Sequence, residues 1–175
     1  MYVEKIEEMP CVWVYKNYFD VKDFIAKFEE EAEKSWAYLP WTKSFTGDTE
    51  NRQESEYRSS LEAPVGILLE KELVADVAEL GDSFKEIFSS IDKCIWDYRN
   101  AYDLFLKEVE VINLLKYEGS AQYHSHHDHS ASNGRILSLI ACFGDDFEGG
   151  ELEFPFFNKT IKLQKNSINS QEKNM

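Results

Sequence analysis

Residues 117–129 are Tyr117-Glu-Gly-Ser-Ala-Gln-Tyr123-His124-Ser-His126-His127-Asp128-His129. All four histidines of the chain fall within the last six positions of this stretch, next to an aspartate. Neutral imidazole is a good ligand for iron, zinc, copper and nickel, and a carboxylate adds charge and oxygen ligation. The stretch therefore predicts a metal site.

Within this stretch, His126 and Asp128 are separated by a single residue. In an extended strand, side chains two positions apart point to the same face, so both could reach one metal ion while His127 points away. On a helix, the same spacing would separate the two side chains by about 200°. The pair therefore requires a strand or the end of one.

The sequence around the pair supplies several short strands. Apolar, β-branched and aromatic residues cluster between turn signals, as is typical of strands. We expect strands at about residues 109–117, 121–127, 135–143, 150–154 and 158–163. We expect turns between them at Gly119-Ser120, Asn133-Gly134, Gly149-Gly150 and Phe157-Asn158. Strands without regular alternation with helices favour an α+β fold over a parallel doubly wound sheet.

The order of motifs in this region resembles a known enzyme superfamily. The motifs are Tyr117-x-Gly119, Tyr123-x-x-His126-x-Asp128, Arg135 at the start of an apolar run, and Glu148-Gly-Gly-Glu151-Leu-x-Phe154-Pro155. Together they resemble the iron(II)/2-oxoglutarate dioxygenases, in particular the prolyl 4-hydroxylase type and its small microbial and phage-like branch. The likeness covers about residues 108–168. His-x-Asp alone is a common motif, and the specificity comes from its distance to the Glu-Gly-Gly-Glu-Leu segment.

The resemblance implies a fold, an activity and a set of ligands. The implied fold is a double-stranded β-helix, a jelly-roll of cupin-like type, supported by N-terminal helices. The implied reaction is hydroxylation of an aliphatic carbon in a peptidyl-proline or similar peptide or small-molecule substrate by O2, with release of succinate and CO2. The implied cofactors are Fe(II), 2-oxoglutarate as cosubstrate, and ascorbate. His126 and Asp128 would be metal ligands, and Tyr117, Tyr123 and Arg135 would line the cosubstrate pocket. The position of Arg135 at a strand start also suits a structural ion pair with an acidic loop residue.

The sequence departs from the family pattern in its last part. The distal histidine ligand and the basic residue that anchors 2-oxoglutarate have no counterpart after Asp128, and residues 169–175 are polar without periodicity. We therefore expect a C-terminally truncated barrel with late strands missing, in which activity is impaired. In addition, Cys142 occupies the position where many relatives carry a tyrosine.

Three alternatives remain open at this point. The first is a non-catalytic remnant or metal-binding module of the same fold. The second is replacement of the lost ligand by His129, if the strand ends at Asp128 and the chain bends back. The third is a cupin-like oxidase based on His124-Ser-His126, although Ser130 stands where that pattern requires a glutamate.

Composition limits the class of protein. A chain of 175 residues with 43% hydrophobic residues predicts a single packed domain. Its net charge of -14 disfavours nucleic acid and anionic membranes as partners. No apolar stretch approaches the length of a membrane span, and the N-terminus lacks the pattern of a signal peptide, so we expect a cytoplasmic protein. The three cysteines have no paired spacing and are expected to be reduced.

The N-terminal part is expected to support the barrel. Residues 1–105 would form a helical region with a short edge strand at 11–15, residues 106–168 the partial β-helix, and residues 169–175 a tail. Asp20 would cap a helix at about 21–35, with its glutamates mostly exposed. A capping box, Ser83-x-x-Glu86, would open a second helix whose aromatic stripe supports the major sheet, after a short helical turn that Gly81 interrupts. The polar segment 40–60 is either part of a lid over the site or an ordinary surface loop.

Overall fold

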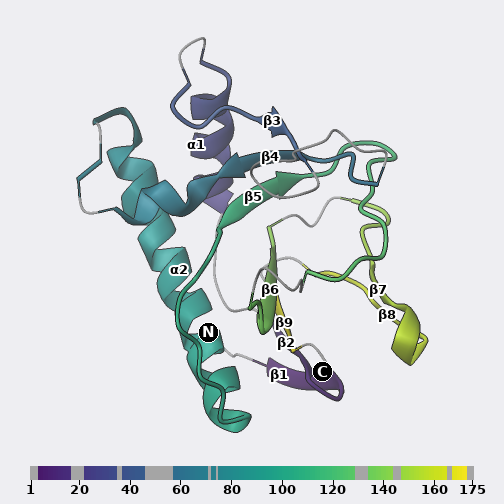
Figure 1. Cartoon of the computed structure of the whole chain (residues 1–175). Coiled ribbons are helices and arrows are strands. Elements are labelled where there is room, and N and C mark those ends of the chain that lie inside the picture. Colours follow the sequence, from purple (N-terminus) through teal and green to yellow (C-terminus); the bar gives the residue numbers. More distant parts are fainter. Residues whose placement is uncertain are drawn as a thin grey trace. The chain divides into compact units, whose positions relative to one another are not determined.

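The structure is a computed structural model that describes residues 4–16, 22–34, 37–45, 57–70, 72–73, 75–128, 134–143, 147–164 and 167–172. The chain divides into two compact units. Unit 1 comprises residues 1–22, 86–107 and 125–175, and unit 2 comprises residues 23–85 and 108–124. Both combine helix with small antiparallel sheets, so the expected α+β class is confirmed (Figure 1). The strands in the described part of the chain do not form a closed barrel.

A four-stranded antiparallel sheet is the centre of unit 1. Its strands are β1 (Glu4–Met9), β2 (Val12–Lys16), β9 (Ser167–Glu172) and β6 (Leu137–Cys142), and they lie side by side in that order (Figure 1). A separate hairpin pairs β7 (Leu152–Phe154) with β8 (Lys159–Ile161) through the 3-10 turn η2 (Pro155–Phe157). Asn158 closes this hairpin in the left-handed region at φ 48°, which Asn adopts more readily than most residues. The expected turn at Phe157-Asn158 is therefore confirmed.

β2 is buried on both faces, because the unit has a layer on each side of the sheet. Val12 and Val14 pack with Met9 and Ile161 in one apolar cluster, to which the β7–β8 hairpin contributes. Trp13 faces the other way, toward a helix, with its ring centroid 4.9 Å from that of Tyr98. A strand covered on both faces needs an unbroken apolar run, and Val-Trp-Val-Tyr supplies it. The expected edge strand is thus corrected to an internal one, with β1 outside it.

β9 corrects the expectation of a polar tail. Residues 169–172 of that expected tail lie within β9, which is hydrogen-bonded to β2 on one side and to β6 on the other. The segment Ser-Ile-Asn-Ser-Gln-Glu lacks the alternation of apolar and polar residues that predicts a strand. It is a strand because its backbone hydrogen-bonds to the two neighbouring strands. In the sequence, the β7–β8 hairpin lies between β6 and β9. β7 pairs with β8 and β6 pairs with β9, so the two pairs are nested.

Helix α2 (Ala75–Ala101) is continuous through the position where an interruption was expected. Ser83 lies within the helix and donates its hydroxyl to the carbonyl oxygen of Glu79, so the prediction of a capping box there is wrong. Gly81 does not break the helix. One stripe of α2 is buried, at spacings of three and four residues: Val77, Leu80, Phe84, Ile87, Ile91, Cys94 and Tyr98. This is the 3.6-residue periodicity that predicted the helix.

The part of α2 in unit 1 supports the sheet, as predicted from its aromatic stripe. The Tyr102 ring centroid lies 5.3 Å from that of Trp13, next to the Tyr98 contact. The Tyr15 hydroxyl donates to Asp97 Oδ2 at 3.0 Å, and Lys5 Nζ pairs with the same oxygen at 3.0 Å. Aromatic packing and polar contacts therefore both fix the helix on β1 and β2.

Unit 2 contains α1 (Lys22–Ala32), η1 (Val65–Leu69) and a sheet in the order β3 (Thr42–Lys43), β4 (Leu61–Pro64), β5 (Asn113–Lys116). Its core is aromatic, with Phe24 and Phe28 of α1 packed against Phe84 and Trp41. The expected helix at 21–35 is confirmed with shorter bounds, while its expected cap, Asp20, lies outside the described residues. Within the segment 40–60, β3 is described and residues 46–56 are not.

One glutamate of α1 is buried, against expectation. Glu31 is only 3% exposed, one turn from Phe28, and accepts hydrogen bonds from Lys34 Nζ at 2.6 Å and from the backbone N–H of Tyr38 at 2.9 Å. Burial alone raises the pKa of this carboxyl, but the hydrogen bonds and the charge of Lys34 outweigh burial and hold the pKa below its ordinary value. Glu31 therefore ties the end of α1 to the segment that follows.

The predicted strands of the C-terminal half are found to different extents. Those at 135–143, 150–154 and 158–163 are confirmed as β6, β7 and β8 with shorter bounds. The one at 109–117 is reduced to β5, and the one at 121–127 is absent apart from an isolated bridge at Tyr123. Among the described residues, no helix is both long and apolar enough to cross a membrane.

Candidate metal centre

His126 and Asp128 come together in unit 1. Nε2 of His126 lies 3.2 Å from Oδ1 of Asp128, and their side chains are 35% and 25% exposed. The prediction that both side chains turn to one side is therefore consistent with the structure. The strand expected to produce this orientation is missing, because residues 124–128 form no ladder with a neighbour.

The separation of the two donor atoms suits a shared metal ion. Ligand bonds from imidazole nitrogen and carboxylate oxygen to a divalent metal such as zinc are about 2.0–2.2 Å long. Two such ligands in neighbouring positions of an octahedron are then about 3 Å apart, by simple geometry from those bond lengths. The observed 3.2 Å between Nε2 and Oδ1 is close to this value. The donor set, one imidazole and one carboxylate, is also the chemistry that non-haem iron uses.

Ser138 joins this pair, although no sequence motif pointed to it. Ser138 lies on β6, and its hydroxyl donates a hydrogen bond to Oδ2 of Asp128. The two carboxylate oxygens thus have different partners, His126 on Oδ1 and Ser138 on Oδ2. The sequence feature that distinguishes Ser138 is that it is the one polar residue in the run Leu-Ser-Leu-Ile-Ala-Cys of β6. This feature alone does not indicate a contact with Asp128.

The segment just before the pair is held in unit 2 by residues 57–59. The backbone N–H of His124 donates to the carbonyl oxygen of Tyr57 at 2.9 Å, and that of Ser59 donates to Gln122 at 3.0 Å. Arg58 and Tyr123 form the isolated antiparallel bridge between these contacts. Residues 57–59 of segment 40–60, which was expected to be a lid or an ordinary surface loop, are therefore paired with the histidine-rich segment.

Tyr123, one of the residues assigned to the cosubstrate pocket, is engaged in unit 2. Its ring lies under the guanidinium of Arg58, with the ring centroid 4.9 Å from Arg58 Cζ. Arg58 also pairs with Glu62 at 3.2 Å and donates to the carbonyl oxygen of Phe45 at 3.3 Å. Such a cation–π contact stabilises the ring in one orientation.

The other two residues of the predicted pocket differ in exposure. Tyr117 is 46% exposed and follows β5 in unit 2. Arg135 is half-buried in unit 1, two positions before the first residue of β6. Of the five predicted site residues, His126 and Asp128 are the two whose side chains the described contacts bring together. The roles of Tyr117, Tyr123 and Arg135 stay predictions.

His129 was the candidate for a third ligand, and His124 belonged to the alternative cupin-like pattern. The Nε2 atom of His124 lies 3.2 Å from Nε2 of Gln122 within unit 2, and His129 lies outside the described residues. Among the residues that the structure describes, no group of three or more His, Cys, Asp or Glu side chains is arranged to hold a metal. Cys142, at the position of the relatives' tyrosine, is buried at the end of β6.

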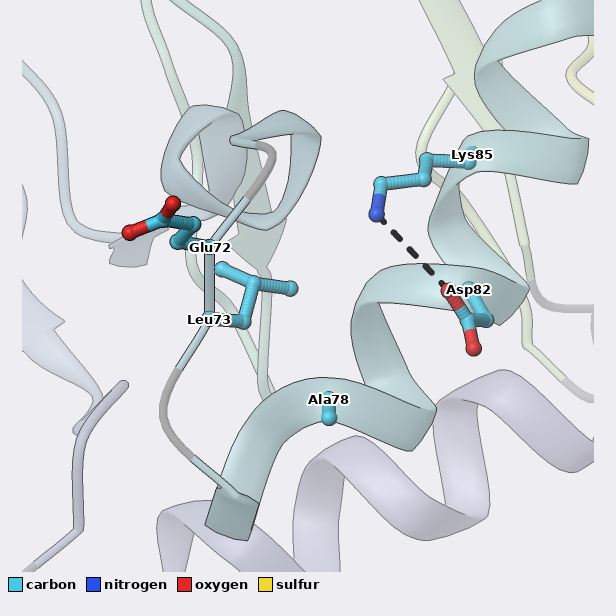
Figure 2. A pocket seen from close by; sticks show the side chains of 5 residues that line it. All are labelled: Glu72, Leu73, Ala78, Asp82 and Lys85. Carbon is cyan, nitrogen blue, oxygen red and sulfur yellow. Dashed lines mark ion pairs between the residues drawn. The ribbon is translucent and has the colours of Figure 1, made fainter.

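A surface pocket in unit 2 is separate from these residues in sequence. It lies between the segment after η1 and the first turns of α2, and is lined by Glu72, Leu73, Ala78, Asp82 and Lys85 (Figure 2). Lys85 and Asp82 point toward one another across one helical turn, 3.7 Å apart. The lining contains none of the predicted site residues.

Comparison of the chain with models of known families, with curated protein sequences and with solved structures finds no match. The functional assignment therefore depends on the motifs and on the geometry of His126, Asp128 and Ser138.

Proposed function

We propose that this chain is an iron(II)/2-oxoglutarate dioxygenase of the prolyl 4-hydroxylase type, with His126 and Asp128 as ligands of the ferrous ion. The observation that carries the proposal is the 3.2 Å approach of Nε2 of His126 to Oδ1 of Asp128. The two atoms lie at the distance of a histidine–aspartate hydrogen bond, and the same separation fits two neighbouring ligands of one ion.

The strand pairing supports the finer fold, a double-stranded β-helix. Such a jelly-roll is a long hairpin folded over on itself, so that inner strands pair within outer ones. β7 pairs with β8, and β6, immediately outside them in the sequence, pairs with β9. The segment with His126 and Asp128 precedes β6, at the place of the next outer strand in such a nested hairpin, although residues 124–128 are not in a strand.

The two ligands have distinct tasks. His126 supplies a neutral nitrogen, and Asp128 supplies an oxygen whose negative charge offsets part of the cation's charge. Two protein ligands leave several of six octahedral positions open, which a chelating cosubstrate and a further ligand can fill. When bound, iron and 2-oxoglutarate supply the oxidative chemistry, in which O2 hydroxylates a substrate carbon while 2-oxoglutarate is converted to succinate and CO2. The protein contributes orientation of the substrate carbon and of the ligand atoms.

A peptidyl-proline or a similar aliphatic group is the proposed substrate class. This choice rests on the likeness of the motifs to prolyl 4-hydroxylases.

The experiment is a turnover assay with Fe(II), 2-oxoglutarate, ascorbate and proline-containing peptides, with succinate and hydroxylated peptide as products. We expect succinate from the wild-type protein and from His127→Ala, and none above background from His126→Ala or Asp128→Ala. Position 127 is a matched control because it is an exposed histidine of the same segment. Equal succinate from all four proteins would contradict the proposal.

A second candidate is a non-catalytic metal-binding module of the same fold. It is favoured by the fact that, in the described part of the chain, the two ligands are not joined by a third His, Cys, Asp or Glu. Loss of one ligand is expected to weaken metal affinity and redox control. Metal uptake that requires His126 and Asp128 but yields no succinate would support this candidate over the enzyme.

A further inference from the structure

We propose that Ser138 is a positioning residue for the metal site, which holds Asp128 in one-oxygen coordination. This inference rests on the proposed function, because it takes His126 and Asp128 as metal ligands. Its evidence is separate, since it comes from the hydrogen bond between the Ser138 hydroxyl and Oδ2 of Asp128.

The hydrogen bond fixes the rotation of the carboxylate. A carboxylate can bind a cation through one oxygen or through both, and rotation about its Cβ–Cγ bond interchanges the two oxygens. Here Oδ1 faces Nε2 of His126, while Oδ2 is turned to the hydroxyl of Ser138. A cation bound by Nε2 and Oδ1 would therefore meet one oxygen of Asp128. The coordination position on the cation that Oδ2 of Asp128 would otherwise take would then be left for another ligand.

The strand that carries Ser138 makes this orientation stable. β6 is paired with β9 along its whole length, and Ser138 lies opposite Gln171 in that ladder. Asp128, in contrast, lies on a segment without strand structure. The hydroxyl thus connects a ligand on an irregular segment to a hydrogen-bonded strand of the sheet. Hydrogen-bonding partners of metal ligands commonly orient them in this way.

The test compares Ser138→Thr with Ser138→Val by titration with Co(II), a spectroscopic substitute for Fe(II). Thr and Val have the same shape and differ in the hydroxyl, and β-branched residues are accepted in strands. We expect Ser138→Thr to bind Co(II) within about threefold of wild type. We expect Ser138→Val and Ser138→Ala to bind it about 10–100-fold more weakly, the usual effect of removing such a partner.

The visible absorption bands of Co(II) give a second readout that folding alone would not change. If the carboxylate turns to offer both oxygens, the coordination number changes and the bands shift in Ser138→Val and Ser138→Ala but not in Ser138→Thr. Ser90→Ala, which removes a hydroxyl on α2 that donates to the Glu86 carbonyl, is the control for loss of a serine elsewhere in unit 1. Circular dichroism establishes that each variant is folded.

The outcomes separate this inference from the proposed function. Equal affinity and equal spectra for Ser138→Thr, Ser138→Val and Ser138→Ala would overturn the role of Ser138, even if His126→Ala abolished binding. Failure of the wild-type protein to bind Co(II), or unchanged binding by His126→Ala, would overturn both. Weak binding by Ser138→Val together with rescue by Ser138→Thr would support the inference.

Discussion

Tyr98 donates its hydroxyl to the backbone carbonyl oxygen of Cys11 at a distance of 2.6 Å. Tyr98 is fully buried on α2, and Cys11 lies in the turn between β1 and β2. The hydrogen bond therefore joins the helix to the sheet of unit 1 at the point where the chain reverses direction.

Replacement of Tyr98 by Phe should destabilise the protein by about 1–2 kcal/mol, because it removes this hydrogen bond and leaves a carbonyl oxygen without that donor. Urea denaturation of the two proteins measures the difference. Tyr102→Phe is the matched control, since Tyr102 is half-buried and its hydroxyl donates a longer hydrogen bond, 3.3 Å, to Glu7 Oε1. A change below about 0.5 kcal/mol is expected there. An equal loss in both variants would contradict the importance of the Cys11 contact.

Cys11 itself has a backbone conformation that suits glycine. Its φ is 62°, in the left-handed region, and it follows Pro10, the order typical of a turn with glycine in the third position. Cys11→Gly should therefore stabilise the protein by about 0.5–1 kcal/mol, by removing the strain of a side chain in this region. A thermal melt measures the change. A lower melting temperature for Cys11→Gly would show that packing of the thiol outweighs this strain.

Glu31 should make the stability of unit 2 depend on pH in the acidic range. Because its pKa is lower in the folded protein than its ordinary value of 4.5, its contribution is present above that value and is lost as pH falls through the folded pKa. Glu31→Gln should cost about 1–3 kcal/mol at neutral pH, and the difference from wild type should shrink below about pH 4.5. Urea denaturation at several pH values tests this. Glu30→Gln, in an exposed position of the same helix, is the control, and a similar pH dependence there would contradict the assignment.

The spacing of apolar residues predicted those helices and strands that pack through apolar side chains. The part of the α2 stripe that carries Phe84, Ile87, Ile91 and Tyr98 was visible in the sequence, because it buries hydrophobic residues at helical spacing. β6 was visible as an apolar run, of which Cys142 is buried and the rest is half-buried. The spacing of His126 and Asp128 predicted that both side chains lie on one face of a strand. The two side chains do approach each other, but on a segment without strand structure.

The elements that the sequence did not reveal depend on polar groups and distant partners. Glu31 is buried because Lys34 and Tyr38 satisfy its carboxylate, and a charged residue alone predicts exposure. β9 is polar in sequence and is a strand because β2 and β6 pair with it. Ser138 is part of the candidate site through one hydrogen bond across ten positions of sequence. None of these contacts has a local sequence pattern.

Gly81 was expected to interrupt a helix and instead permits close packing. A Cβ atom at this position would collide with the Leu73 side chain and lie 3.2 Å from the carbonyl oxygen of Leu68. Gly81→Val should therefore destabilise the protein by about 1–3 kcal/mol through overpacking. Ala78→Val, one turn earlier and facing the pocket in Figure 2, is the matched control and should cost less than about 1 kcal/mol. Equal costs in urea denaturation would contradict the packing argument.

The most direct test of the metal site is a crystal structure of the protein grown without oxygen in the presence of Fe(II), with anomalous data at the iron edge. We expect one iron peak about 2.0–2.2 Å from both Nε2 of His126 and Oδ1 of Asp128. An iron bound by other residues, or the absence of iron beside these two atoms, would contradict the account.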